Sequence, residues 1–163
     1  MSKIIYQCYV TSPTGWIEIS GNDESVSSVL FMTEAKTDSP QLSQPVIECK
    51  TQRLEYFEGK RKDFDLSISQ DGTDFQKRVW SQLCSIPFGK TISYMQLARN
   101  LGDPKCIRAA GTANGRNKIA IIVPCHRVIG SSGTLVGYAG GLDRKRWLLE
   151  HEARMSGQQA LAL

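Results

Sequence analysis

The sequence predicts an α+β protein built from two domains, and two observations carry this prediction. Strand-like runs dominate up to Asp71, whereas apolar side chains recur at helical spacing after it. The charge changes at the same place: the residues before Phe75 include 7 Lys and Arg against 12 Asp and Glu, and the remainder include 13 against 4. We therefore expect domains over residues 1–72 and 73–155, followed by a tail over 156–163.

The charge asymmetry also bears on function. A basic part beside an acidic part favours a nucleic-acid-binding module, because contacts to phosphates need Lys and Arg on one surface. An asymmetry that arises by chance carries equal weight as an explanation. Charge alone therefore suggests DNA or RNA as a partner without establishing it.

The first domain is predicted to begin with three short antiparallel strands over residues 3–10, 15–20 and 26–33, which turn residues separate. A polar connection with two prolines covers residues 35–45. It leads into a helix that ends at Gly59.

That helix places Ile47, Leu54 and Phe57 on one face. Residues 64–69 are expected to return to the sheet.

The second domain is predicted to be mainly helical. Thr73 and Gln76 have the spacing of a capping box, and Phe75, Val79 and Leu83 follow at intervals of four residues. These five residues predict a helix that starts directly after the domain boundary.

Two further helices have the signals of a helix-turn-helix. Ser93 can cap the first of them, which runs to Leu101, and Gly102 stops it. Asp103 then caps a helix predicted over residues 104–114, with a proline in its first turn.

This third helix is unusual for a DNA reader because most of its side chains are small. Arg108 stands out as a long side chain beside Ala109, Ala110, Gly111 and Ala113. A small-residue surface would allow the close backbone approach that a narrow minor groove requires. Tight packing against another helix explains the composition equally well.

Composition excludes several classes of protein. At 40% apolar and 22% charged residues, the chain is expected to be globular. No apolar run reaches membrane-spanning length and the start lacks a signal-peptide pattern, so we expect an intracellular protein. Five unpaired cysteines favour a reducing compartment, and the two histidines show no zinc-site spacing.

Cys125 is the candidate nucleophile. The apolar, mostly β-branched run Ile119–Val123 is expected to be buried, and it places Cys125 at a site that is backed by the protein interior. Arg127 lies close to Cys125 in sequence. A neighbouring base or positive charge shifts a thiol towards the reactive thiolate. His126 could act on it through a water or a chain bend, because adjacent side chains point apart in regular structure. The other four cysteines are expected to be inert apolar residues.

A base of this kind needs a group that orients it. Glu150 or Glu152 could do so, although spacing alone favours solvated positions paired with nearby arginines. Both lie on a last helix that Asp143 is expected to cap. Residues 130–133 and 137–141 are predicted to be loops with room for a ligand.

From Phe75 to Glu152 the chain resembles the catalytic domain of the O6-alkylguanine-DNA alkyltransferases. Six motifs carry this resemblance in order, namely Ile86-Pro87-Phe88-Gly89, Ser93-Tyr94 with Leu97-Ala98, Arg108-Ala109-Ala110-Gly111, Ile122-Val123-Pro124-Cys125-His126-Arg127-Val128-Ile129, Gly137-Tyr138-Ala139-Gly140-Gly141-Leu142, and Leu148-Leu149 with Glu152. The first domain is similar to the family's small ribonuclease-H-like domain in length and strand order. The second would then be winged-helix-turn-helix-like.

The resemblance implies a catalytic group of five residues. Cys125 would accept the alkyl group, His126 would deprotonate it through a water, and Glu152 would orient His126. Asn117 would be a hinge, and Tyr94 would press on a backbone phosphate and hydrogen-bond the guanine. Irreversible, stoichiometric transfer from O6-alkylguanine to the cysteine follows, with O4-alkylthymine left open.

The remaining implied residues contact DNA or the flipped base. Arg108 would fill the gap that the flipped nucleotide leaves. The other implied DNA contacts are Ala109, Gly111 and Ser131, and the implied pocket residues are Tyr138, Gly140 and Val128. Two departures from the family pattern, Lys118 after the hinge and Ala120 near the pocket, leave the preferred alkyl size open.

The resemblance further implies double-stranded DNA bound through its minor groove, a monomer that could bind DNA cooperatively, and no cofactor, metal or membrane. The expected location is the cytoplasm, or the nucleus in a eukaryote. Three rivals are a non-catalytic protein that binds alkyl lesions, a thiol hydrolase and a plain transcription factor. The acceptor cysteine argues against the first and third, and the adjacency of Cys125 and His126 argues against the second.

Overall fold

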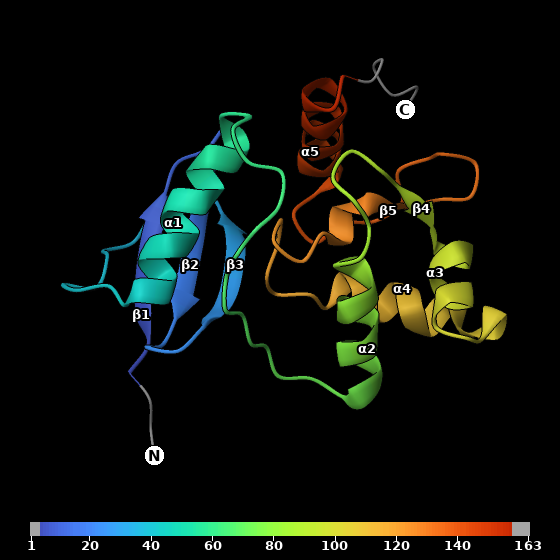
Figure 1. The fold of residues 1–163 in the computed structure, drawn as a ribbon, viewed down its shortest axis with the longest axis horizontal. Helices are drawn as coiled ribbons and strands as arrows, with labels where there is room; N and C mark the ends of the chain where they lie inside the picture. Colours follow the sequence, from blue (N-terminus) through green and yellow to red (C-terminus); the bar gives the residue numbers. More distant parts are fainter. Residues whose placement is uncertain (1–3, 158–163) are drawn as a thin grey trace. The chain divides into compact units, whose positions relative to one another are not determined.

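The computed structural model describes residues 4–157, which divide near Gln70 into two compact units (Figure 1). The first unit holds a three-stranded sheet and one long helix, and the second is mainly helical. The protein is therefore α+β, as the sequence predicts. Within residues 4–157, none of the helices combines the length and apolarity that crossing a membrane requires. Most of the predicted tail, residues 158–163, lies outside the described residues.

The sheet of the first unit is an antiparallel meander of β1 (Tyr6–Val10), β2 (Trp16–Gly21) and β3 (Val26–Met32). All three predicted strands are present, with ends shifted by a few residues. The predicted return of residues 64–69 to the sheet is reduced to one parallel bridge between Val26 and Ile68.

Helix α1 (Gln44–Phe57) covers one face of this sheet (Figure 1). The prediction of its apolar face was wrong, because Ile47 is 43% exposed and Leu54 48%. The helix instead buries Val46, Cys49 and Tyr56, together with two polar side chains. Pro45, assigned to the connection, lies in its first turn, where a missing N–H leaves no helical hydrogen bond unmade.

The two buried polar side chains explain the error. Arg53 donates from Nη1 to the carbonyl of Thr11 over 2.8 Å, and Gln52 exchanges two hydrogen bonds with the backbone of Asp65, each 2.9 Å long. A polar residue can be buried when backbone groups satisfy it. Apolar periodicity does not report such partners.

The second unit opens with α2 (Asp74–Leu83), and the predicted capping box is confirmed. Thr73 Oγ1 accepts from the backbone N–H of Gln76 over 3.1 Å, and Gln76 Oε1 accepts from that of Thr73 over 2.9 Å. Trp80 is buried on this helix and donates from Nε1 to the carbonyl of Ala113 over 2.9 Å. This bond ties α2 to α4 (Ile107–Gly115).

Helices α3 (Tyr94–Asn100) and α4 form the predicted pair across a tight turn. Ser93 caps α3, and Gly102 ends it in the left-handed region with φ of 90°. The residues Pro104–Cys106, predicted as the start of α4, form a separate 3-10 turn that Asp103 caps. On α4, Ala110 and Ala113 are buried whereas Ala109 is exposed. Small residues therefore allow close packing on one face of the helix, and on the other face they leave a surface without long side chains.

A short parallel pairing brings the site residues together. Strand β4 (Ile92–Ser93) runs directly into Tyr94, and β5 (Val128–Ile129) directly follows the 3-10 turn Cys125–Arg127. Because Ile92 pairs with Val128 and Ser93 with Ile129, the start of α3 lies beside the end of β5, the strand that continues from the Cys125 turn.

The last helix, α5 (Leu142–Met155), packs against the 3-10 turn that carries Cys125. Asp143 was expected to cap it, but the cap position is Gly141 and Asp143 lies in the first turn. A carboxylate there still interacts favourably with the helix dipole.

The Thr73 cap gives a stability prediction. Replacing Thr73 with Ala removes the acceptor for the N–H of Gln76 and should lower the free energy of unfolding by about 1 kcal/mol. Thr51→Ala, at an exposed position inside α1, is the matched control and should change it by less than about 0.5 kcal/mol. Urea denaturation measures both, and equal effects would contradict the role of the cap.

Candidate active site

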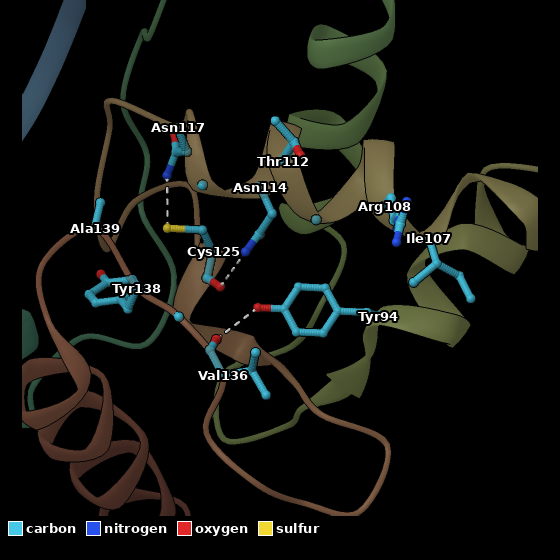
Figure 2. Close-up of a pocket in the computed structure, with 13 residues that line it drawn as sticks. Tyr94, Ile107, Arg108, Thr112, Asn114, Asn117, Cys125, Val136, Tyr138 and Ala139 are labelled. Carbon is cyan, nitrogen blue, oxygen red and sulfur yellow. Dashed lines mark hydrogen bonds between the residues drawn. The ribbon is translucent and has the colours of Figure 1, made fainter.

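A pocket of about 480 Å³ opens beside Cys125 in the second unit (Figure 2). Its walls come from α4, from the loop before α5 and from the start of α3. The lining residues are Tyr94, Ile107, Arg108, Gly111, Thr112, Asn114, Gly115, Asn117, Cys125, Val136, Gly137, Tyr138 and Ala139. The volume lies in the range of ordinary ligand pockets.

The segment before Cys125 is buried, as predicted, but it is folded into turns. Ile119 and Ile121 are fully buried, and Ile121 has φ of 73°, in the left-handed region that a β-branched residue rarely adopts. Such a conformation costs about 1–3 kcal/mol and persists only where the surroundings enforce it. The site is therefore backed by a rigid and strained turn.

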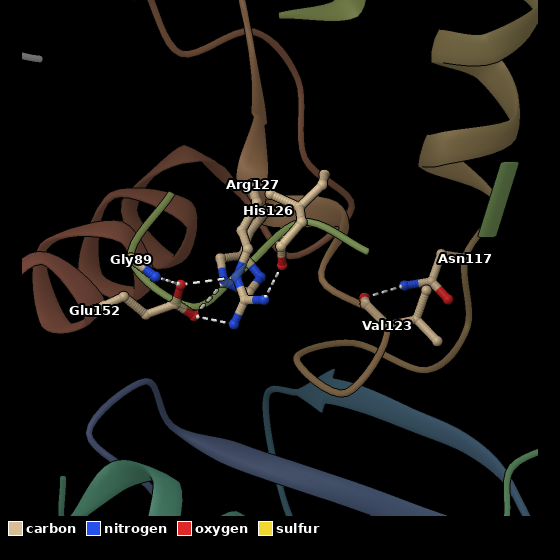
Figure 3. Close-up of polar contacts among 7 residues, drawn as sticks. Gly89, Asn117, Val123, His126, Arg127 and Glu152 are labelled. Carbon is tan, nitrogen blue, oxygen red and sulfur yellow. Dashed lines mark hydrogen bonds and ion pairs between the residues drawn. The ribbon is translucent and has the colours of Figure 1, made fainter. Parts of the chain in front are cut away.

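Asn117 holds this turn together. Its Nδ2 donates to the carbonyl of Val123 over 2.9 Å and to Sγ of Cys125 over 3.2 Å, and its Oδ1 accepts from the N–H of Ile119 over 3.1 Å (Figures 2 and 3). One amide thus links the end of α4, the strained turn and the sulfur.

The surroundings of Cys125 act on its thiol in opposite directions. Burial raises the pKa and is the largest effect, whereas hydrogen bonds from Asn117 and Tyr138 and the charge of Lys145 lower it. The net pKa is raised, contrary to the expectation that a neighbouring charge favours the thiolate. Arg127 does not supply that charge, because its guanidinium faces Glu152. The thiol therefore keeps its proton until a base accepts it.

His126 and Glu152 form a buried pair on the other side of this turn (Figure 3). Nε2 of His126 lies 2.7 Å from Oε2 of Glu152, and both side chains are almost fully buried. Nδ1 of His126 is also buried and makes no hydrogen bond within the described part of the chain. Of the two carboxylates that the sequence left open, Glu152 thus contacts the histidine, and the expectation of a solvated position was wrong for it.

Glu152 is ionised because its partners outweigh burial. Burial raises its pKa, but the charges and hydrogen bonds of His126 and Arg127 hold it well below the usual range. Burial also lowers the pKa of His126, and the positive charges of Arg127 and Lys145 lower it further against the opposing effect of Glu152. A neutral imidazole beside a carboxylate is the form that can accept a proton.

Lys145 is a site residue that the sequence analysis missed. It is fully buried and donates from Nζ to the carbonyls of Val128, Val136 and Gly137, over 2.7, 3.1 and 3.3 Å. Burial lowers its pKa to about 8. Its spacing of seven residues before Glu152 was the available signal, since both face the interior from α5.

Tyr94 lies at the pocket and shares a partner with Lys145. Its hydroxyl donates to the carbonyl of Val136 over 3.1 Å (Figure 2). Asn114, a second missed residue, is buried against the pocket and donates from Nδ2 to the carbonyl of Cys125 over 3.4 Å. Both contacts join the walls of the pocket around the sulfur.

The structure gathers some predicted residues at the pocket and leaves others away from it. Those lining it are Cys125, Asn117, Tyr94, Arg108, Gly111 and Tyr138, with His126 and Glu152 behind the cysteine. Gly140 and Val128 are not among the lining residues: the carbonyl of Gly140 accepts from Arg144, and that of Val128 accepts from Lys145. Ala109 and Ser131 are exposed outside it.

A metal site has no support in the geometry. Among residues 4–157, no three His, Cys, Asp or Glu side chains are grouped closely enough to hold an ion. The site consists instead of a buried thiol, a histidine and a carboxylate beneath a helix-turn-helix. This arrangement is typical of a protein whose cysteine reacts with a group presented by DNA.

Comparison with known families agrees with this class. Residues 74–154 match the family described as 6-O-methylguanine DNA methyltransferase, DNA binding domain, and residues 4–70 match that family's ribonuclease-like domain. The chain belongs to the 6-O-methylguanine DNA methyltransferase family.

Named relatives and solved structures cover nearly the whole chain. A methylated-DNA–protein-cysteine methyltransferase of Methanosarcina barkeri is 44% identical over 91% of this chain and 97% of its own length. The crystal structure of the Mycobacterium tuberculosis O6-methylguanine methyltransferase is 39% identical, covers 93% of this chain and 94% of its own, and has a TM-score of 0.84. A structure of Mycobacterium tuberculosis OGT in complex with DNA is 42% identical over 90% and 92%, with a TM-score of 0.81.

The buried pair gives a prediction on stability. Glu152→Gln leaves Arg127 buried without a counter-charge and should lower the free energy of unfolding by about 3–5 kcal/mol at pH 7. Glu150→Gln, half-buried on the same helix, is the matched control and should cost less than about 0.5 kcal/mol.

The same variant has a defined pH dependence. Because the pKa of Glu152 is lower in the folded state than the unfolded value of about 4.3, the ionised carboxylate stabilises the fold fully above that pH. The stabilisation is lost as the pH falls towards the folded-state pKa. Urea titrations should therefore show that the difference in free energy of unfolding between wild type and Glu152→Gln shrinks below about pH 4.3. A difference that stays constant with pH would contradict the lowered pKa of Glu152 in the folded state.

Proposed function

We propose that this protein repairs DNA by direct reversal, moving the alkyl group of O6-alkylguanine irreversibly to Cys125. The observation that carries the proposal is the Cys125 thiol in the wall of a pocket, bonded to Asn117 and followed in the chain by the His126–Glu152 pair. It is a methylated-DNA–protein-cysteine methyltransferase that acts once.

The chemistry needs a nucleophile and a proton path. Sγ of Cys125 forms a bond to the alkyl carbon while the bond from that carbon to O6 breaks, and the electron pair leaves with the guanine. The thiol proton passes through a water to Nδ1 of His126. The departing guanine takes up a proton in turn, and the Tyr94 hydroxyl at the pocket is well placed to deliver it. The thioether that results is stable, so each molecule repairs one lesion.

The pocket implies that the damaged base leaves the helix. A base inside a duplex is out of reach, and extruding it costs a few kcal/mol. Arg108 projects from α4 at the rim of the pocket and would fill the gap in the stack (Figure 2). The short side chains of Ala109 and Gly111 would let the backbone of α4 come close to the DNA in the minor groove. Ser131 would add a further contact to the DNA there.

Two roles remain for the pocket walls. Tyr138 would stack on the base, since it lines the same pocket as Cys125 (Figure 2). Gly140 and Val128 would act indirectly, by shaping the loop and the strand on which Tyr138 and Lys145 depend. Asn117 would carry movement of α4 to the turn that holds Cys125.

The wider setting follows from the same reaction. The second domain, over residues 73–155, carries the site, and residues 1–72 form a separate domain. The protein acts as a monomer in the compartment that holds DNA, which is the cytoplasm or, in a eukaryote, the nucleus. A non-catalytic role in lesion binding is not favoured, because an acceptor thiol is present beside a base.

The stoichiometry tests the function directly. Duplex DNA containing O6-methylguanine should add one methyl group per protein, located at Cys125, because nothing in the site can remove a thioether. Peptide mass spectrometry locates the group, with Cys125→Ser as the control that binds the lesion but gains no mass. Unchanged mass in the wild type would favour lesion binding alone, and repeated turnover would exclude a single-use acceptor.

The role of Arg108 gives a second test. Arg108→Ala should slow repair of duplex DNA about tenfold or more, since it loses part of the energy that offsets flipping. Repair of a single-stranded oligonucleotide should change much less, because no stack has to be filled. Arg154→Ala, an exposed arginine outside the pocket, is the control. Equal slowing on both substrates would refute the assignment.

A further inference from the structure

The carboxylate of Glu152 has four nitrogen atoms within hydrogen-bonding distance (Figure 3). Oε1 accepts from the backbone N–H of Gly89 over 3.2 Å and from Nε of Arg127 over 2.8 Å. Oε2 lies 2.7 Å from Nε2 of His126 and 3.1 Å from Nη2 of Arg127. A carboxylate has about four lone-pair sites, so this one is fully occupied. Half of its partners come from Arg127, which the proposed reaction has not used.

Arg127 is itself held on two further sides. Its Nη1 donates to the carbonyl of Ile86 over 2.7 Å, and its Cζ lies 5.7 Å from the centre of the Phe88 ring. The turn from Ile86 to Gly89 thus contacts both the guanidinium of Arg127 and the carboxylate of Glu152. Arg127 is only 6% exposed, so little water screens its charge. This planar, two-pronged geometry is specific to arginine.

The position of Arg127 matters for the protonation of His126. The charged groups that act on this imidazole are Glu152 and Lys145 from α5 and Arg127 from its own turn, in which the titratable Cys125 precedes it. A buried carboxylate with no other partner would draw a proton onto the imidazole, and His126 would then hold protons on both nitrogens. Nδ1 could no longer accept one from the thiol.

We propose that Arg127 is a positioning residue that takes up the charge of Glu152, so that His126 stays neutral with its proton on Nε2 and Nδ1 remains free to act as the base. Glu152 then orients the ring without protonating it. This rests on the proposed function only in naming Cys125 as the thiol that His126 serves.

The test uses iodoacetamide, which alkylates the Cys125 thiolate without DNA. The rate at Cys125 is followed against pH by peptide mass spectrometry, which separates it from the more exposed Cys84 and Cys106. Arg127→Met removes a buried positive charge, so the acid limb of the profile should move to higher pH by about one unit or more. Arg127→Lys keeps the positive charge but loses the paired contact of the guanidinium with both carboxylate oxygens of Glu152. The acid limb of its profile should stay near that of wild type, while the rate of Cys125 alkylation falls.

The control is Arg154→Met, which removes an exposed charge from α5 and should leave the profile unchanged. An unshifted acid limb in a folded Arg127→Met protein would overturn the proposal. Should that variant not fold, nuclear magnetic resonance of His126 in the wild type decides: a neutral ring with its proton on Nε2 at pH 7 supports the proposal, and an imidazolium overturns it. Neither readout depends on DNA repair, so a failure of the proposed function would be seen separately.

Discussion

The buried carboxylate of Glu152 is the constraint on which the rest of the second unit depends. An isolated charge in the protein interior is too costly to keep, so the fold must bring it partners. It does so by joining α5 to the turn that carries His126 and Arg127 and to the backbone of Gly89. These contacts also set the direction of His126, so the same interaction stabilises the fold and prepares the reaction.

The cysteine is placed under opposite demands by this fold. Burial protects the thiol and raises its pKa, which argues against a free thiolate in the resting protein. Asn117, Tyr138 and Lys145 lower the pKa again, so the cost of removing the proton is reduced. The strained turn at Ile121 and the grip of Asn117 hold the sulfur at the pocket. A protein that reacts once can accept such a tightly packed site, because it never has to release a product from the sulfur.

Much of this architecture could be predicted from local sequence signals. The capping box at Thr73, the stop at Gly102 and the turn residues that separate the strands of the first unit each depend on residues close in the chain. The face of α1 could not, because Arg53 and Gln52 are buried by backbone partners distant in sequence.

The site divides in the same way. Cys125 and His126 are adjacent and were found directly, whereas the place of Glu152 in the interior depends on a partner 26 residues away. Lys145 was missed because a lysine on a helix is usually solvated, and the carbonyls that bury it, those of Val128, Val136 and Gly137, lie 8 to 17 residues away. Arg127 was credited to Cys125 because its actual partner, Glu152, is 25 residues away in the chain. The central claim is that His126 accepts the proton of Cys125. Single-turnover transfer from O6-methylguanine in duplex DNA tests it in His126→Gln, where we predict a rate about 10²–10⁴-fold lower with unchanged affinity for the lesion. A rate within about twofold of wild type would contradict it.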